Sequence, residues 1–180
     1  MDLLNQHLQN IQRPFVQSSV QNNVQYRQPR ADNLQACQAF AQTIGFSASA
    51  ASIMNNTCMV LGTRDIGPVQ APNGHVIRTP HLNVIGFSYE TDAQGRVFNA
   101  GETVILQEEA DTLIKELSQR NISVTGLHNH WNLTTPFVLY IHFVNLDQTP
   151  QQFARNVADA FNVVRNNRNT TTLRQSINRS

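Results

Sequence analysis

Three histidines in the second half of the chain are the residues best suited to chemistry. His128 and His130 are two positions apart, so their side chains point to the same face of an extended strand. The break at residues 132–136 can close a hairpin, and one antiparallel register of that hairpin places His128 opposite His142 and His130 opposite Tyr140. Three imidazoles then converge on one sheet face, as a ligand set for a divalent metal ion or as acid–base groups.

A divalent metal ion, zinc or manganese, is the cofactor that this pattern predicts, with His128, His130 and His142 as its ligands. Glu102 is the candidate general base, because its strand leads into the connection that reaches the histidine strand, and His130 is a second catalytic candidate. The residues expected to line a pocket for a small polar ligand are Asn129, Trp131 and Tyr140. For an enzyme of this kind, the pattern favours metal-assisted hydrolysis or proton transfer.

The alternative is a non-enzymatic interaction protein in which the histidines are structural. His128 and His130 share the parity of Ile122 and Val124, so they lie on an apolar face where polar groups need hydrogen-bond partners. The string His-Asn-His does not indicate an HNH nuclease, because those enzymes spread the three residues over a much longer stretch. We therefore expect no nucleic-acid partner.

The elements that would position these residues follow from hydrophobic periodicity, which is two in strands and three to four in helices. From residue 82 onward, the pattern predicts strands at 82–90 and 97–106 joined by a turn at 92–95, a helix at 107–120, strands at 122–131 and 137–145, and a helix starting at Pro150. In the first hairpin, a register in which paired positions sum to 188 puts Glu90 and Glu102 on the same face. This β-β-α-β-β-α order predicts an α+β fold with a mixed, mainly antiparallel sheet and helices on one face, with a ferredoxin-like second half as one option.

The first half of the chain predicts a helix that ends at Ile44, followed by short strands at 50–54 and 58–61. Cys37 falls on the helix and Cys58 on the second strand. Two cysteines are too few for a disulfide framework, and they lack the CxxC spacing of redox motifs. We therefore expect both to be buried as small hydrophobic side chains.

A long segment at residues 62–80 is rich in glycine and proline, which predicts a loop. Arg64 and Arg78 could form an anion site in this loop. Solvated loop charge is the simpler interpretation of both arginines, and it is the one that we favour.

Composition limits the classes of partner. The 180 residues carry a net charge of +1, and only 14% are charged, compared with roughly 25% in globular domains. A nearly neutral chain offers little attraction to nucleic acid or to an anionic membrane. The N-terminus lacks a basic segment followed by an apolar run, and no apolar run approaches the roughly 20 residues that span a bilayer. The expectation is a soluble, cytoplasmic protein.

Residues 31–166 are expected to form a single domain. Residues 1–30 are rich in Gln and Asn, which predicts a flexible arm that can dock to a partner protein. Residues 167–180 are expected to form a polar, frayed tail.

Several motifs together resemble a known family. They are Gly101-Glu102-Thr103-Val104-Ile105-Leu106-Gln107-Glu108-Glu109 before a helix, then Ile122-Ser123-Val124-Thr125-Gly126-Leu127-His128-Asn129-His130-Trp131, and finally Tyr140-Ile141-His142-Phe143. In these segments the chain resembles the LppY/LpqO-like family of uncharacterised bacterial domains, from roughly Asn33 to Val164. The resemblance implies one copy of the domain and implies no activity.

Overall fold

One six-stranded sheet forms the centre of the computed structural model, which describes residues 31–132 and 134–177. The strands lie in the order β1-β2-β5-β6-β8-β7, and every neighbouring pair is antiparallel. In chain order they are β1 (Ala51–Met54), β2 (Thr57–Thr63), β5 (Val84–Thr91), β6 (Val97–Leu106), β7 (Ser123–Trp131) and β8 (Val138–Asn145). A separate two-stranded ladder joins β3 (Val69–Gln70) to β4 (Val76–Ile77).

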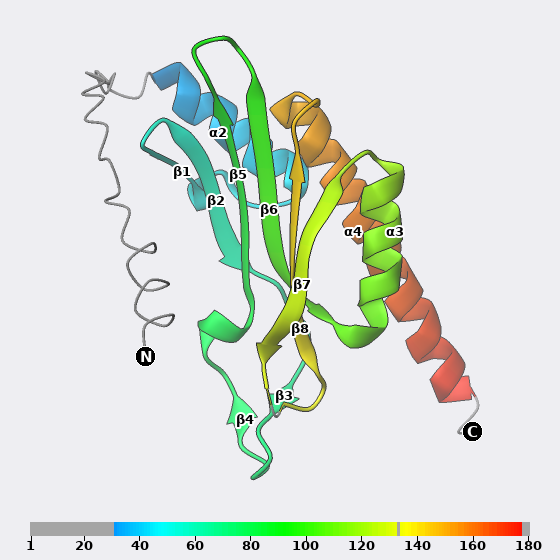
Figure 1. Cartoon of the computed structure of the whole chain (residues 1–180). Helices are drawn as coiled ribbons and strands as arrows, with labels where there is room; N and C mark the ends of the chain where they lie inside the picture. The colour runs from blue at the N-terminus through cyan, green and yellow to red at the C-terminus, as the bar shows by residue number, and fades with distance from the viewer. Residues whose placement is uncertain (1–30, 133, 178–180) are drawn as a thin grey trace, which may run out of the picture.

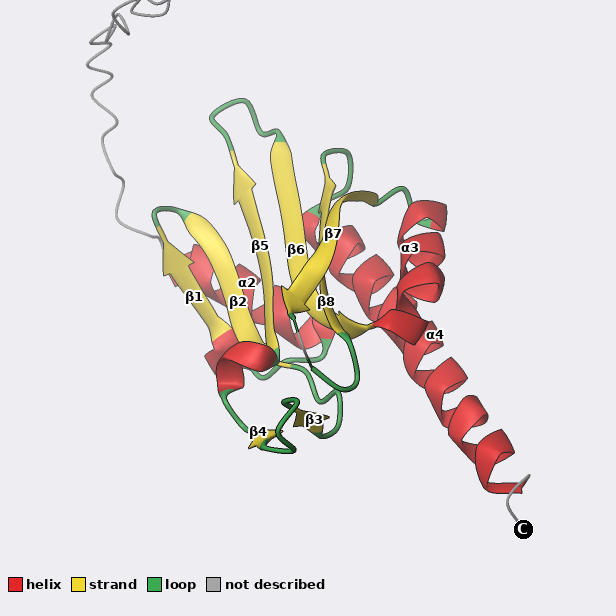
Figure 2. Cartoon of the chain, turned by 60° about the horizontal axis from the view of Figure 1, so that its bottom comes forward, coloured by secondary structure: helices red, strands yellow, loops and turns green. Residues whose placement is uncertain are grey.

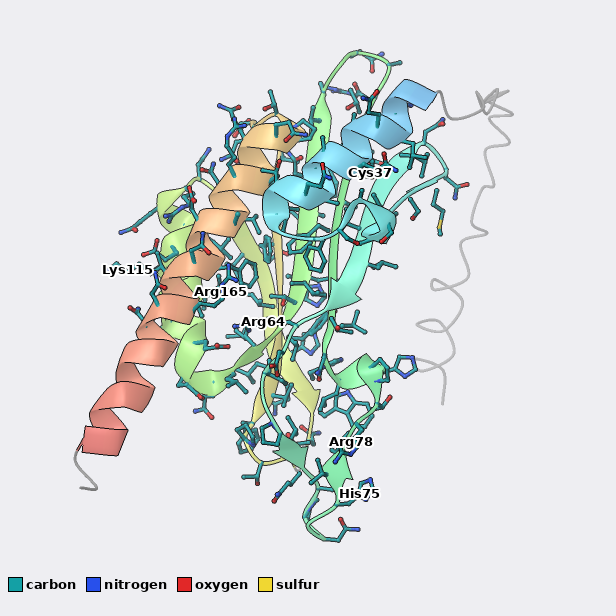
Figure 3. All side chains as sticks on the ribbon, turned by 180° about the vertical axis from the view of Figure 1, so that it is seen from behind. Cys37, Arg64, His75, Arg78, Lys115 and Arg165 are labelled. Carbon is teal, nitrogen blue, oxygen red and sulfur yellow. A yellow bond between two sulfur atoms is a disulfide. The ribbon has the colours of Figure 1, made fainter. Side chains whose placement is uncertain are left out.

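Three α-helices cover one face of this sheet (Figure 1), and the view from behind has α2 and α4 in front of the strands (Figure 3). They are α2 (Ala31–Ile44), α3 (Ala110–Gln119) and α4 (Pro150–Ile177). The described residues also form the 3₁₀ turns η1 (Ala48–Ala50), η2 (Pro80–Leu82) and η3 (Gln107–Glu109). The predicted α+β class, with helices on one face, is confirmed. The sheet has no adjacent parallel strands, because β8 lies between the parallel pair β6 and β7.

The main core fills the space between the sheet and the helices. Alternate residues of each strand point into this core, as the period of two requires. Phe87 and Phe143 are therefore buried in it, whereas some of the residues next to them in sequence, which point to the other face, are partly exposed. From the helix side, Phe153 of α4 packs against Phe143, and Phe40 of α2 packs against Phe153. Each such side chain stabilises the fold by about 2–3 kcal/mol through its burial.

The opposite face of the sheet is only partly covered. Near one end, residues 64–82, with the β3–β4 ladder, pack over Val104, Leu106, Val138 and Tyr140 to form a second, smaller core. Figure 2 shows this ladder beyond the end of the six strands. The rest of the face, which we call the open face, exposes Leu61 at 52% and Phe98 at 41%. The boundary between the covered and open parts falls at the row that contains Glu102 and His142.

The connection from β6 through α3 to β7 crosses over β8, which makes a split βαβ unit. Ferredoxin-like folds contain such a unit. In this chain a further strand, β5, comes directly before it, so a ferredoxin-like second half stays a prediction. The β5–β6 hairpin has the predicted register, since Gly86 pairs with Glu102 and Glu90 with Phe98. Its predicted turn at residues 92–95 is also present, with Gly95 at a φ of 80°.

The predicted register of the β7–β8 hairpin is wrong. His128 lies opposite Tyr140, not His142, and His142 lies opposite Gly126. At the turn, Trp131 pairs with Val138, which is already one position from the predicted register, and the β-bulge between Asn129 and Trp131 adds one more. Near the histidines the pairing is therefore two positions from the predicted one. The shift of two keeps His128 and His142 on one face. The bulge between Val124 and Gly126, however, leaves Ile122 and Val124 on the core face, so the predicted common face of His128 with these two residues is wrong.

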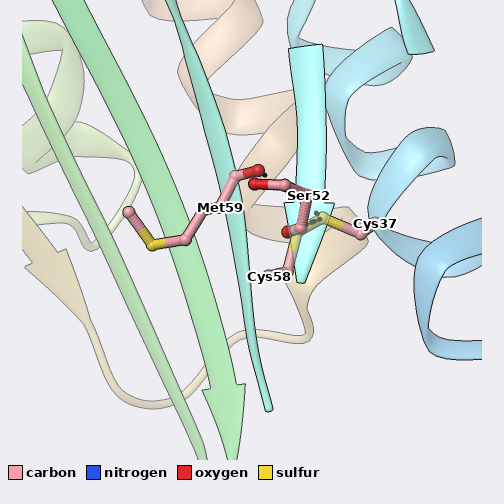
Figure 4. Close-up of a disulfide and its surroundings, with 4 residues drawn as sticks. All are labelled: Cys37, Ser52, Cys58 and Met59. Carbon is pink, nitrogen blue, oxygen red and sulfur yellow. Dashed lines mark hydrogen bonds between the residues drawn. A yellow bond between two sulfur atoms is a disulfide. The ribbon is translucent and has the colours of Figure 1, made fainter. Parts of the chain in front are cut away.

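Cys37 and Cys58 are joined in a disulfide, with Cα atoms 5.5 Å apart, which links α2 to β2 (Figure 4). Their predicted burial is confirmed, but the prediction of two free, small hydrophobic side chains is wrong. The separation of 21 residues says nothing about how α2 packs on the sheet, and that packing creates the bond. The Cys37 sulfur also lies 3.5 Å from the Ser52 carbonyl oxygen, but a disulfide sulfur has no proton to donate.

Arg64 was predicted to be a solvated loop charge, and this prediction is wrong. Its guanidinium makes a two-pronged ion pair with Glu109, at 2.8 and 2.9 Å, and donates to the Val104 carbonyl. Glu109 is 4% exposed and also accepts from the Leu106 amide at the start of η3. This pair fastens the loop after β2 to the start of the crossover helix.

Helix α4 continues to Ile177, beyond the predicted boundary at residue 166, where the composition becomes polar. The arm predicted at residues 1–30 lies outside the described residues. Within the described residues, no helix is long and apolar enough to cross a membrane. The cytoplasmic location stays a prediction, and the disulfide argues against it, because reducing compartments keep most thiols unpaired.

Candidate functional site

Three neighbouring strands bring the candidate residues together on the open face. Glu102 of β6 is paired directly with His142 of β8, and His142 is paired with Gly126 of β7. Glu102 therefore reaches the histidines through β8, and not through the strand that follows the crossover, as its sequence position had suggested. Because Gly126 has no side chain, nothing on β7 stands between His142 and the next residue on the same face, His128.

These residues form a line of polar contacts. Glu102 Oε2 lies 3.3 Å from His142 Nδ1, and His142 Nε2 lies 3.1 Å from His128 Nε2. At the far end, His128 Nδ1 lies 3.0 Å from the main-chain carbonyl oxygen of Asn129. The two imidazole rings are nearly parallel, at 19°, with centroids 5.3 Å apart. We call Glu102, His142 and His128 the polar line.

The two ends of the polar line determine where the imidazole protons lie. A carboxylate and a carbonyl oxygen only accept hydrogen bonds, so each of them favours a proton on the Nδ1 atom that it faces. A neutral imidazole protonated at Nδ1 carries a lone pair at Nε2. Two lone pairs then face each other across 3.1 Å. A cation shared by both Nε2 atoms, either a proton or a metal ion, would relieve this repulsion.

His130 is not part of the polar line. It sits at the second bulge of β7, and its ring lies 4.4 Å from that of Tyr140 and 6.3 Å from that of Trp131, centroid to centroid. Its Nδ1 atom is buried without a hydrogen-bond partner among the described residues. Burial, followed by the nearby His128, lowers the pKa of His130, so this imidazole is neutral at neutral pH.

Tyr140 lies between the histidines and the smaller core. Its ring centroid is 5.3 Å from that of His142 and 6.0 Å from that of His128. Burial, with a smaller effect from the Glu102 carboxylate, raises the pKa of Tyr140 to about 12. The phenol is therefore protonated at neutral pH, and it is a hydrogen-bond donor or a packing surface, not a metal ligand.

The other predicted ligand-binding residues lie at the hairpin end. The Asn129 side chain is exposed and donates to the Asn132 side chain at 3.3 Å, while its carbonyl oxygen faces His128. Trp131 is 39% exposed and contacts His130 edge to face. The structure thus places Trp131 and Tyr140 beside His130, and it ties Asn129 to the polar line through its main chain.

A shallow groove of about 350 Å³ runs along the open face next to the polar line. Its lining includes two residues that contact each other, Glu102 and His142. The rest of the lining is mostly apolar or small and includes Met59, Leu61, Ser88 and Ala100. The groove is not among the features predicted from the sequence. The predicted register of the β5–β6 hairpin already placed Gly86 opposite Glu102, which was the available signal.

The three histidines predicted as metal ligands are not assembled into one group. Across residues 31–132 and 134–177, no group of three or more His, Cys, Asp or Glu side chains is placed to hold a metal ion. The structure brings the Nε2 atoms of His128 and His142 together and leaves His130 aside. The Glu102 oxygen nearest the histidines faces Nδ1 of His142, which suits a residue that orients an imidazole.

A family model matches residues 38–163, which is more than two thirds of the chain, and its description is Domain of Unknown Function (DUF1259). The chain therefore belongs to this family. The name LppY/LpqO-like stays a prediction. No curated protein and no solved structure matches the chain.

Proposed function

We propose that this member of the DUF1259 family binds a divalent metal ion through the Nε2 atoms of His128 and His142, beside a groove for a small polar ligand. The observation that carries the proposal is the 3.1 Å separation of these two atoms, while each Nδ1 atom faces an acceptor. An ion about 2.0–2.1 Å from both nitrogens would bind them at an angle of about 95–100°, which lies between octahedral and tetrahedral geometry.

Glu102 and the Asn129 carbonyl oxygen have a positioning role in this proposal. Metal-bound histidines commonly donate their other ring N–H to a carboxylate or a carbonyl oxygen, which fixes the tautomer and the ring orientation. Two imidazoles favour zinc and similar ions over manganese, which prefers oxygen ligands. With only two protein ligands, the remaining coordination positions would belong to water or to a bound ligand.

The chemistry that follows is activation of a metal-bound water molecule, for hydrolysis or proton transfer. Glu102 Oε1 is the oxygen left to accept a proton, since Oε2 faces His142. His130 remains a candidate acid–base group, because its neutral form predominates at neutral pH.

A second candidate function needs no metal ion. The same 3.1 Å contact is a normal hydrogen-bond distance, so one added proton would let the pair satisfy all three contacts of the polar line. The polar line would then transfer protons between the groove and the hairpin end. A structural role of the histidines in a non-enzymatic interaction protein is the third interpretation.

Zinc titration of untagged, chelator-treated protein tests the metal proposal. We expect close to one zinc ion per chain for the wild type, and loss of binding in His128→Gln and in His142→Gln. Glu102→Gln should weaken binding about 10- to 100-fold without abolishing it. His75→Gln is the matched control, because His75 is exposed in the loop and lies outside the polar line.

Two outcomes would overturn the metal proposal. One is the absence of zinc, manganese or other divalent binding to the wild type. The other is binding that survives both histidine substitutions. In that case, nitrogen NMR of the two imidazoles distinguishes the remaining roles. A proton shared by the pair favours the second candidate, whereas two neutral rings with a large loss of stability in the variants favour a structural role.

A further inference from the structure

The groove on the open face has a recognisable chemical character. Its apolar side is formed by Leu61 and Met59 of β2, and its middle by the small residues Ser88 and Ala100. A volume of about 350 Å³ is at the small end of the range for ligand sites, so a single ring with a short substituent fits it.

Charge in the groove comes from one contact. Among its lining residues, Glu102 and His142 are the ionisable ones, and none is Arg or Lys. The Glu102 side chain lies across Gly86, with Oε1 3.4 Å and Leu61 Cδ2 3.3 Å from the position where a Cβ on Gly86 would stand. The carboxylate therefore presents Oε1 beside the apolar wall of Leu61, while Oε2 faces His142.

A carboxylate oxygen only accepts hydrogen bonds and repels anions. The ligand that matches this surface therefore donates a hydrogen bond, carries no negative charge and has an apolar body. A neutral ligand also tolerates the nearby cation that the metal proposal places between the histidines, whereas an ammonium ion would be repelled by it.

We propose that the groove binds a neutral alcohol or phenol, with its hydroxyl group donating to Glu102 Oε1 and its hydrocarbon part lying against Leu61 and Met59. This proposal rests on the proposed function in naming the ligand class of the same site. Only the exclusion of an ammonium ion depends on the metal ion. The hydroxyl contact with Oε1 does not require it, so the two proposals can be tested separately.

The test uses three probes of similar shape with full-length protein in excess chelator. Benzyl alcohol offers a donor, benzyl methyl ether has only an acceptor, and benzoate is an anion. Binding is followed by the NMR shifts of the backbone amides that line the groove. We expect benzyl alcohol to bind about tenfold more tightly than the ether, as one hydrogen bond to a carboxylate allows, and benzoate to bind most weakly.

Two variants make the result specific. In Glu102→Leu the preference for the alcohol over the ether should fall to about one, because the acceptor is gone while the bulk is kept. Glu90→Leu is the matched control, since Glu90 lies on the same face of the same hairpin, four positions away, and does not line this groove. It should keep the preference.

Equal binding of alcohol and ether by the wild type would overturn the ligand proposal. So would tightest binding of benzoate, an unchanged preference in Glu102→Leu, or shifts that map away from the groove. None of these results bears on zinc binding, which is measured without chelator. Failure of the metal proposal is likewise visible in the zinc titration alone.

Discussion

Reduction of the Cys37–Cys58 disulfide should lower the free energy of unfolding by about 3 kcal/mol. The bond closes a loop with a sequence separation of 21 residues. In the chain-entropy model, a loop of this length removes enough freedom from the unfolded chain to stabilise the native state by about 3 kcal/mol at 25 °C. Reduction removes no side-chain atoms and leaves no cavity, so we expect this entropy difference to be the main effect.

A small compensation is expected in the reduced protein. The thiol of Cys37 regains a proton and can donate to the carbonyl oxygens of Ser52 and Met59, 3.5 and 3.9 Å away. These are long contacts to a weak donor, so they should recover only a fraction of the loss. Guanidinium unfolding with and without a phosphine reductant measures the difference. The dependence on denaturant should steepen on reduction, because the unfolded chain expands.

The control is the double variant Cys37→Ala/Cys58→Ala, whose stability should not respond to the reductant. A reduction effect below about 1 kcal/mol in the wild type would refute the reasoning about the loop. Two reactive thiols in denatured, unreduced protein would refute the disulfide itself. If the disulfide were intact in protein purified from a reducing compartment, it would no longer argue against a cytoplasmic location.

Three further substitutions test other contacts of the fold. Arg64→Ala should destabilise the chain by about 3 kcal/mol in thermal or chemical unfolding, because it deprives the buried Glu109 carboxylate of its ion-pair partner. Gly101→Ala should cost about 1–3 kcal/mol, because its Cβ would clash with the buried ring of Phe143. The Arg96 backbone N–H, and after it the Arg96 side chain, lowers the pKa of Asp92 by donating hydrogen bonds to the carboxylate. The ionised Asp92 therefore stabilises the turn at pH values above the ordinary pKa of aspartate, and this stabilisation is lost as the pH falls through the lowered pKa. Arg96→Gln should raise that pKa only part of the way in an NMR titration, because the backbone donor remains, and a complete return to the ordinary value would contradict this.

Local patterns predicted most of the elements and one of the two hairpin registers. The β5–β6 hairpin was predictable because its turn, Asp92 to Gly95, fixes the pairing of the strands that flank it. The Asn55-Asn56 turn between β1 and β2 was predictable for the same reason, and both residues have the positive φ that such a turn needs. The capping box of Thr149 and Gln152 likewise starts α4 through contacts three residues apart.

Contacts between distant segments were not predictable from one sequence. The disulfide depends on how α2 packs on the sheet, and the Arg64–Glu109 pair joins residues 45 positions apart. Neither pair carries a local signature, since periodicity shows only that a residue is buried or exposed. The groove has no local signature either, although the predicted register already placed its Gly86 opposite Glu102.

The polar line shows how an incorrect register can still place two residues in contact. The turn and the bulge between Asn129 and Trp131 together place His128 two positions from the one opposite His142, and a shift of two keeps both histidines on the open face. The distance between diagonal neighbours on that face is within the reach of long side chains, so the imidazoles meet at 3.1 Å although their backbones are not paired. The same shift separates His130, because the second bulge gives it a position of its own beside Tyr140. Parity therefore determined which residues could meet, and the bulges determined that two histidines would meet and not three.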